Sequence, residues 1–147
     1  MTLEPFIADH LELMTLQPRQ RQAWARHGSR DYLLEAERHG GWSVFHGQQL
    51  LLCGGVMARI PEEPLLWSFI SADAGRHMVA LLRVTRRFIE VCGHSFVYAT
   101  SEVHFRSGCR FLAMLGFERM HWADGRPAVL PKYGLDGEDH ALYEWVN

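Results

Sequence analysis

Apolar residues recur along the chain with two different periods, and their alternation predicts a mixed α and β structure. Short apolar or alternating runs typical of strands occupy residues 2–6, 42–46, 49–59, 65–70, 95–100, 118–122 and 140–146. Apolar residues at helical spacing occupy residues 7–14, 18–38, 76–92 and 105–115, and a break near Gly28 divides 18–38 into two short helices. The order is strand, helices, three strands, helix, strand, helix and two strands.

The run from Leu65 to Ile70 is nearly all apolar, which indicates a central strand that is covered on both faces. A helix connects it to the strand at 95–100, so these two strands are expected to be parallel. The pair Gly54-Gly55 inside a strand pattern predicts a bulge or a close approach of another backbone. Turns or loops are expected at Pro61-Glu62-Glu63-Pro64 and in a long segment containing Pro127, Pro131, Gly134 and Gly137.

These elements predict an α/β (α+β) fold with a mixed, mostly antiparallel sheet of six to seven strands and helices on both faces. With 147 residues, 48% of them hydrophobic, the chain is long enough for one substantial core and too short for two. We therefore expect a single domain over residues 1–147.

Composition excludes several classes of function. The net charge is −2, which does not favour a nucleic-acid partner. No segment approaches the roughly 18 apolar residues of a membrane span, and a basic, apolar leader is lacking, so a soluble cytoplasmic protein is expected. Cys53, Cys92 and Cys109 lie in apolar patterns without a CxxC pair and are expected to be reduced core residues. No His or Cys spacing predicts a metal site.

The break after the central strand is the first indication of a binding site. Strand 65–70 runs into Ser71-Ala72-Asp73-Ala74-Gly75, and a two-faced helix follows at once. A helix that starts beyond the carboxyl end of a strand leaves backbone N–H groups free to hold an anion. The sequence therefore predicts a site for a phosphate-bearing cofactor at this turn.

Two segments carry a resemblance to a known family. Residues 78–82 resemble the cofactor helix of the GNAT superfamily of acyl-CoA-dependent N-acyltransferases, and residues 110–117 resemble the helix of that family that ends in Leu-Gly-Phe. The resemblance covers essentially the whole chain. Residues 67–73 together with 110–112 also resemble small GNAT-like proteins of tailed phages.

The resemblance implies acetyl-CoA, or another acyl-CoA, as a co-substrate. Its pyrophosphate would lie at a helix that begins near Gly75, with Arg76, His77 and Met78 as neighbours. Its pantetheine would lie along Phe69, Ile70 and Ser71 as an added strand, between two strands that diverge. Asp73, Arg76 and Met78 occupy the three fixed positions of the family's phosphate signature, and all three differ from it. Asp73 is alternatively an ordinary helix cap.

Acylation of an amine requires a base for the ammonium and is helped by an acid for the departing thiolate. The position at which the family often has a Tyr acid is occupied here by Leu112, which cannot donate a proton. The residues considered as replacements for the acid are His104, Ser107, Cys109 and Tyr98, and those considered as the base are Glu62, Glu63 and His46. His104 and Ser107 are equally explained as residues that start a helix, and Cys109 and Tyr98 as core.

Two functions follow. The first is an N-acyltransferase that moves an acetyl group from acetyl-CoA to an amine, with a backbone N–H near residues 69–71 polarising the thioester carbonyl. The second is a catalytically inactive GNAT-shaped protein that binds a virion or host protein partner and is itself located in a phage virion. The acceptor and the oligomeric state are left open.

Overall fold

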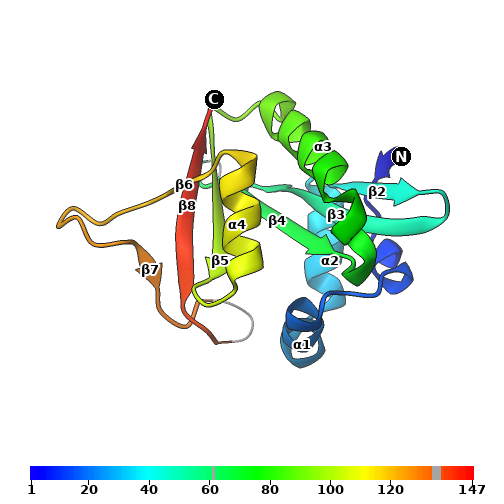
Figure 1. The fold of residues 1–147 in the computed structure, drawn as a ribbon, viewed down its shortest axis with the longest axis horizontal. Helices are drawn as coiled ribbons and strands as arrows, with labels where there is room; N and C mark the ends of the chain where they lie inside the picture. The colour runs from blue at the N-terminus through cyan, green and yellow to red at the C-terminus, as the bar shows by residue number, and fades with distance from the viewer. Residues whose placement is uncertain (61, 134–136) are drawn as a thin grey trace.

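The computed structural model describes residues 1–60, 62–133 and 137–147. Figure 1 shows a twisted sheet with helices on both sides. Along the chain the elements are β1 Thr2–Pro5, η1 Ala8–Leu13, α1 Pro18–His27, α2 Arg30–Arg38, β2 Trp42–His46, β3 Gln49–Met57, β4 Leu65–Ile70, η2 Ala72–His77, α3 Met78–Val91, β5 Phe96–Glu102, α4 Arg106–Leu115, β6 Glu118–Arg119, β7 Val129–Leu130 and β8 His140–Val146.

Within the described residues the sheet has eight strands in the order β1-β2-β3-β4-β5-β8-β6, and β7 also pairs with β8. β4 and β5 are parallel, and the other pairs are antiparallel. The predicted mixed, mostly antiparallel class is confirmed. The predicted strand number is one too low because Val129 and Leu130, inside the expected long loop, pair with Ala141 and His140.

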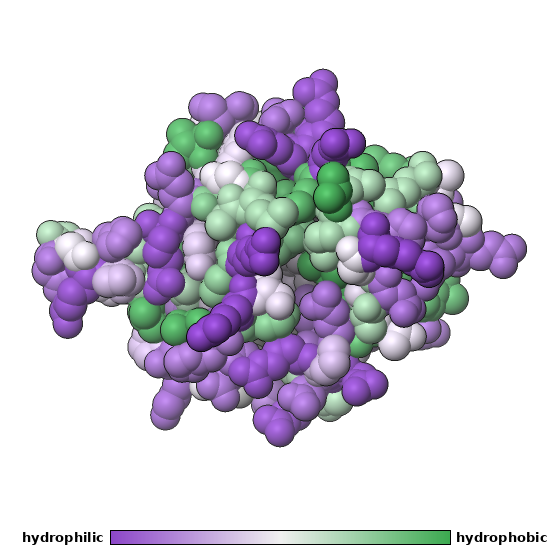
Figure 2. Space-filling model, in the orientation of Figure 1, coloured by the Kyte–Doolittle hydropathy of each residue, from purple (hydrophilic) through white to green (hydrophobic). Residues whose placement is uncertain are grey.

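Two hydrophobic cores lie on opposite faces of the sheet. Leu66 and Ile70 of β4 pack into a core with α3 and α4, whereas Trp67 and Phe69 pack into a second core with η1 and α2. Because side chains alternate along a strand, β4 contributes to both cores, and its predicted burial on two faces is confirmed. In Figure 2 polar residues cover much of the α3–α4 face, with apolar surface between them.

The glycine pair in β3 marks a close backbone approach. A Cβ atom on Gly55 would lie 2.9 Å from the Cα of Gly41 and 2.9 Å from Nε1 of Trp67. The irregular register in this part of the sheet falls instead between Val44 and Phe45 of β2. The small residue at position 55 thus lets the β1–β2 side of the sheet pack against Trp67.

Most predicted elements are present, and the structure differs from the prediction mainly in where they begin and end. The segment after β1 is a 3₁₀ helix, and the two short helices at 18–38 are confirmed. The long helix begins as an α-helix at Met78, not near Gly75 or Arg76, because η2 precedes it. β5 extends to Glu102, and β6 ends at Arg119. Pro61 and Gly134 of the predicted turns lie outside the described residues.

Gly116 ends α4 with a φ of 97°, the left-handed conformation that favours glycine, as the Leu-Gly-Phe pattern predicts. Among the described residues, no helix is both long and apolar enough to cross a membrane.

Candidate functional site

β4 and β5 diverge at the centre of the sheet. In the described structure they share one register pair, Leu65 with Tyr98, at the start of β4. Figure 1 shows β4 running away from β5 beyond this point. The splayed pair that the resemblance implies is therefore present, and the parallel arrangement is confirmed. The space between the second half of β4 and the second half of β5 is called the slot below.

The edge of β4 that faces the slot can be assigned from its pairing with β3. The N–H of Ser71 donates to the carbonyl of Leu51 across the β3–β4 ladder, at 2.9 Å. N–H and C=O directions alternate along a strand, so Phe69 also faces β3, while Ser68 and Ile70 face the slot. Of the three residues predicted to line the pantetheine, Ile70 alone directs its peptide groups into the slot.

The side chain of Gln20, in the first turn of α1, pairs with this edge. Its Nε2 donates to the carbonyl of Ser68 at 2.8 Å, and the N–H of Ile70 donates to its Oε1 at 2.8 Å. A primary carboxamide thus lies on β4 as a backbone amide of a neighbouring strand would lie. No sequence pattern predicts this contact, because a Gln in a polar helix is expected to face water.

The segment before α1 continues the pairing. The N–H of Gln17 donates to the carbonyl of Ile70 at 3.2 Å, and the N–H of Ala72 donates to the carbonyl of Thr15 at 2.8 Å. An isolated antiparallel bridge joins Leu16 to Ser71. The chain therefore adds a short strand of its own to β4, next to the place predicted for the pantetheine.

Glu102 ends β5 with a buried carboxylate. Its side chain is 6% exposed and forms an ion pair with Arg19, whose side chain is 49% exposed. Val97 and Ala99 of β5 pack under α3 and α4, so the alternate residue Glu102 points to the other face, toward α1. Sequence reasoning missed Glu102 because the expected strand stopped at 100. A carboxylate shortly after the carboxyl end of an apolar strand pattern is the signal that would have indicated it.

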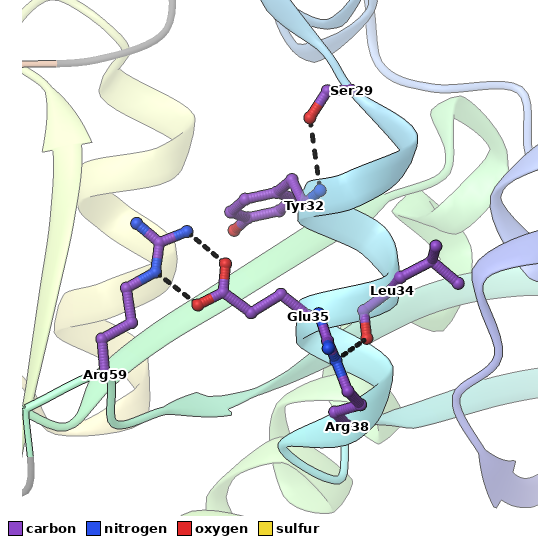
Figure 3. A network of polar contacts seen from close by, with 6 residues as sticks. All are labelled: Ser29, Tyr32, Leu34, Glu35, Arg38 and Arg59. Carbon is purple, nitrogen blue, oxygen red and sulfur yellow. Dashed lines mark hydrogen bonds and ion pairs between the residues drawn. The ribbon is translucent and has the colours of Figure 1, made fainter.

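α2 and the first residue of β8 lie on the same face. Figure 3 shows the side chain of Arg59, beyond β3, paired with Glu35 of α2, with the two carboxylate oxygens 2.7 and 2.6 Å from the guanidinium nitrogens. Tyr32 lies beside this pair, and burial raises its pKa to about 12. Opposite Glu102 in the β5–β8 register stands His140, whose Nδ1 lies 3.3 Å from Oγ1 of Thr100.

A cavity of about 390 Å³ lies behind α1, between η1, α1 and α2. Its walls include the apolar residues Leu16, Trp24 and Leu33 and the charged residues Glu12, Arg21 and Arg30. Mainly apolar walls with a few charged groups are typical of a small-molecule site. The cavity lies on the face of the sheet to which Glu102 points.

Cationic groups gather where β4 leads into α3. The rings of His46 and His77 lie 4.5 Å apart, and the charge of Arg76 also acts on His77. Partial burial, His46 and Arg76 lower the pKa of His77, because each opposes its charged form. Gly75 is exposed, with open space where a Cβ would be. The alternative prediction of Asp73 as a helix cap is wrong, because Ser71 caps η2. The Asp73 carboxylate accepts a hydrogen bond from the Gln49 side chain.

The other predicted candidates are dispersed. Leu112 is buried in the α3–α4 core, and His104 and Ser107 are exposed at the start of α4. Cys109 is half-buried and its thiol lies 3.6 Å from the carbonyl of Glu102, so it alone among these residues reaches the end of β5. Half-buried Tyr98 packs edge-on against Phe96. Glu62 and Glu63 are exposed in their turn.

No protein-family model matches the chain, and no curated protein matches it. Solved structures do. Ard1 from Thermoplasma volcanium is similar with a TM-score of 0.75 and 14% identity, over 99% of this chain and 96% of that one. A probable acetyltransferase from Staphylococcus epidermidis has a TM-score of 0.74 and 12% identity, over 99% and 98%.

An aminoglycoside 6'-acetyltransferase of type Ii has a TM-score of 0.67 and 14% identity, over 99% of this chain and 97% of that one. The chain has the GNAT acetyltransferase fold. At these identities the likeness shows the fold alone, and the chemistry must be argued from the residues of the slot.

Proposed function

We propose that the protein is an N-acyltransferase that uses an acyl-CoA, acetyl-CoA in the simplest case, and that its reaction takes place in the slot. The divergence of β4 and β5 after one register pair is the observation that carries this proposal. Along this edge Ser68 and Ile70 are not paired with β5 and are met instead by Gln20 and Gln17, and a ligand with amide groups could take the place of the Gln20 side chain.

One contact within the protein supports the fit of such a ligand. The carboxamide of Gln20 already donates to Ser68 and accepts from Ile70, so this edge binds an amide with ordinary hydrogen-bond geometry. A pantetheine chain contains two amides. On this proposal the Ser68 carbonyl and the Ile70 N–H bind one of these amides. Alternatively, the Ile70 N–H orients the thioester carbonyl.

The basic side chains at the start of α3 support the same orientation. Arg76 and His77 lie at the carboxyl end of β4, where the phosphates of a CoA along β4 would lie. Asp73 opposes an anion there, and its hydrogen bond with Gln49 disperses part of its charge. The predicted role of Gly75, Arg76, His77 and Met78 as phosphate neighbours remains a proposal.

Glu102 is proposed as the base. Acyl transfer forms a C–N bond and breaks the thioester C–S bond, which releases CoA as its thiolate, and it requires the acceptor ammonium to lose a proton, which a carboxylate oxygen of Glu102 would accept. A buried carboxylate also binds an ammonium ion more strongly than an exposed one does. Leu112 cannot donate a proton to the departing thiolate. Among the candidate acids of α4, the thiol of Cys109 lies at the end of β5.

Titration calorimetry with acetyl-CoA tests the binding step, with an adenine nucleotide that lacks pantetheine as the control ligand. We expect saturable binding of acetyl-CoA that the control ligand does not reproduce. Mass spectrometry of a panel of amines then tests transfer by the acetyl mass increment. If acetyl-CoA at millimolar concentration neither binds nor stabilises the protein, the proposal is wrong.

A second function is favoured by two observations. Leu112 lies in the core where the family often has its acid, and α1 covers the slot. Both suit a GNAT-shaped protein that binds a partner without catalysis. Failure of acetyl-CoA binding would favour this alternative, and the narrower resemblance to phage proteins stays a prediction.

A further inference from the structure

The first turn of α1 connects the two strands of the slot. Gln20 bonds to Ser68 and Ile70 of β4, and the adjacent Arg19 pairs with Glu102 at the end of β5. Consecutive side chains of one helix thus hold the two diverging strands. Any ligand that pairs with Ser68 and Ile70 must break both contacts of Gln20.

α1 is weakly attached to the rest of the protein. It contains no buried residue, its N-cap Gln17 makes no capping hydrogen bond with its side chain, and its first turn has no acidic residue. Its main apolar contact is the half-buried Trp24, whose ring meets Phe69 edge-on at 5.4 Å. Helices with few buried contacts open at a low free-energy cost compared with core elements.

The contacts of α1 also resemble those of the two proposed substrates. Gln20 presents a carboxamide to β4, as a pantetheine amide would. Arg19 presents a cation to Glu102, as an acceptor ammonium would. A half-exposed guanidinium above a buried carboxylate is well suited to exchange with another cation, since Arg19 can move into water while Glu102 stays in place.

We propose that α1 is a lid that closes the slot with substrate-like side chains, so that acyl-CoA binds only after the first turn of α1 has left β4. This inference rests on the proposed function. The observed affinity is then the intrinsic affinity multiplied by the fraction of molecules in which the lid is open. A change that weakens the lid must strengthen binding, which is the opposite of what loss of a ligand-contacting residue does.

The variant Gln20→Ala tests the lid by calorimetry with acetyl-CoA. We expect about tenfold tighter binding than in the wild type, which corresponds to about 1.4 kcal/mol. Gln22→Ala removes an exposed Gln from the same helix and is the matched control, with the affinity of the wild type expected. Thermal unfolding of both variants verifies that they are folded.

The outcomes separate the lid from the proposed function. If the wild type binds acetyl-CoA and Gln20→Ala binds it equally or more weakly, the lid is wrong and the proposed function stands. If neither protein binds acetyl-CoA at millimolar concentration, both are wrong. If the wild type binds weakly and Gln20→Ala binds clearly more tightly, both are supported.

Amide hydrogen exchange gives a readout that does not depend on catalysis. In the free wild type the N–H of Ile70 should be protected, and Gln20→Ala should speed its exchange, whereas Gln22→Ala should not. Saturating acetyl-CoA should speed exchange of the amides within α1 while Ile70 stays protected. Unchanged protection of α1 in the bound wild type would overturn the lid.

Discussion

The two edges of β4 differ in how they are closed. Along β3, six consecutive residues of β4 are in register with a partner strand. Along β5 there is one register pair, and the rest of the edge is met by Gln20, Gln17 and Thr15. The same strand is thus fixed on one side by a continuous ladder and on the other by contacts from a marginally attached segment.

The difference shows which edge of β4 contributes to the stability of the fold and which edge can change its contacts. A ladder of backbone hydrogen bonds between buried strands opens only with the fold. A side chain that bonds to a strand edge exchanges for a ligand when its helix moves. The β3 edge therefore belongs to the scaffold, and the β5 edge is the candidate site.

The largest effect is expected for Glu102→Gln, on the slot side. Gln cannot accept the proton of the acceptor, so acetyl transfer should fall about 100- to 10,000-fold. Because the variant also removes the ion pair that holds Arg19, the affinity for acetyl-CoA should be unchanged or higher. Steady-state rates and calorimetry measure the two quantities separately.

The matched control for this prediction is Glu118→Gln, an exposed carboxylate in β6. It should retain the rate of the wild type. A Glu102→Gln variant that transfers acetyl groups at the wild-type rate would show that Glu102 is not the base.

On the scaffold side, Leu52→Ala should destabilise the fold by about 2–5 kcal/mol, because Leu52 is fully buried and the change leaves a cavity. Urea unfolding measures this loss. Leu13→Ala, at a residue that is 67% exposed, should change the free energy of unfolding by less than about 0.5 kcal/mol. Equal losses in the two variants would contradict the assignment of β3 to the core.

The sequence predicted the scaffold better than the site, and the reason is physical. Apolar periodicity reports burial, so β4, β8 and α4 were predicted with nearly their observed bounds. The end of β5 was not, because Ser101 and Glu102 are polar although buried. The predicted start of α3 was too early because Ala72–His77 form a 3₁₀ helix. Over six residues, apolar spacing does not distinguish a 3₁₀ helix from an α-helix.

The slot contacts were beyond sequence reasoning for a different reason. Divergence of two strands was expected from the family resemblance, and the structure shows it. Gln20 and Arg19 lie far from β4 and β5 along the chain, and no local pattern relates them. Only the packing of α1 against the sheet brings these residues together.

At the phosphate end of the slot, Arg76→Glu should weaken acetyl-CoA binding about tenfold, because it replaces a neutralising charge with a repelling one. Arg83→Glu makes the same change at an exposed position farther along α3 and is the control. Calorimetry at two salt concentrations should show that the difference shrinks at higher salt. Equal affinities of the two variants would place the phosphates elsewhere.

The smallest expected effect concerns pH and the same end of the slot. The pKa of His77 is lowered in the folded protein by partial burial and by the nearby His46 and Arg76, so the unfolded chain binds a proton more readily than the folded one. His77 therefore contributes stability above its unfolded pKa of about 6.5, and this contribution is lost as the pH falls through the folded pKa. Acidification should destabilise the wild type more than His77→Gln.

Urea midpoints at pH 7.5 and 5.5 measure this difference, with His27→Gln, on the exposed side of α1, as the control for loss of one imidazole. The change in midpoint between the two pH values should be smaller in His77→Gln than in His27→Gln. If the two variants respond to pH alike, the cations near α3 do not act on His77.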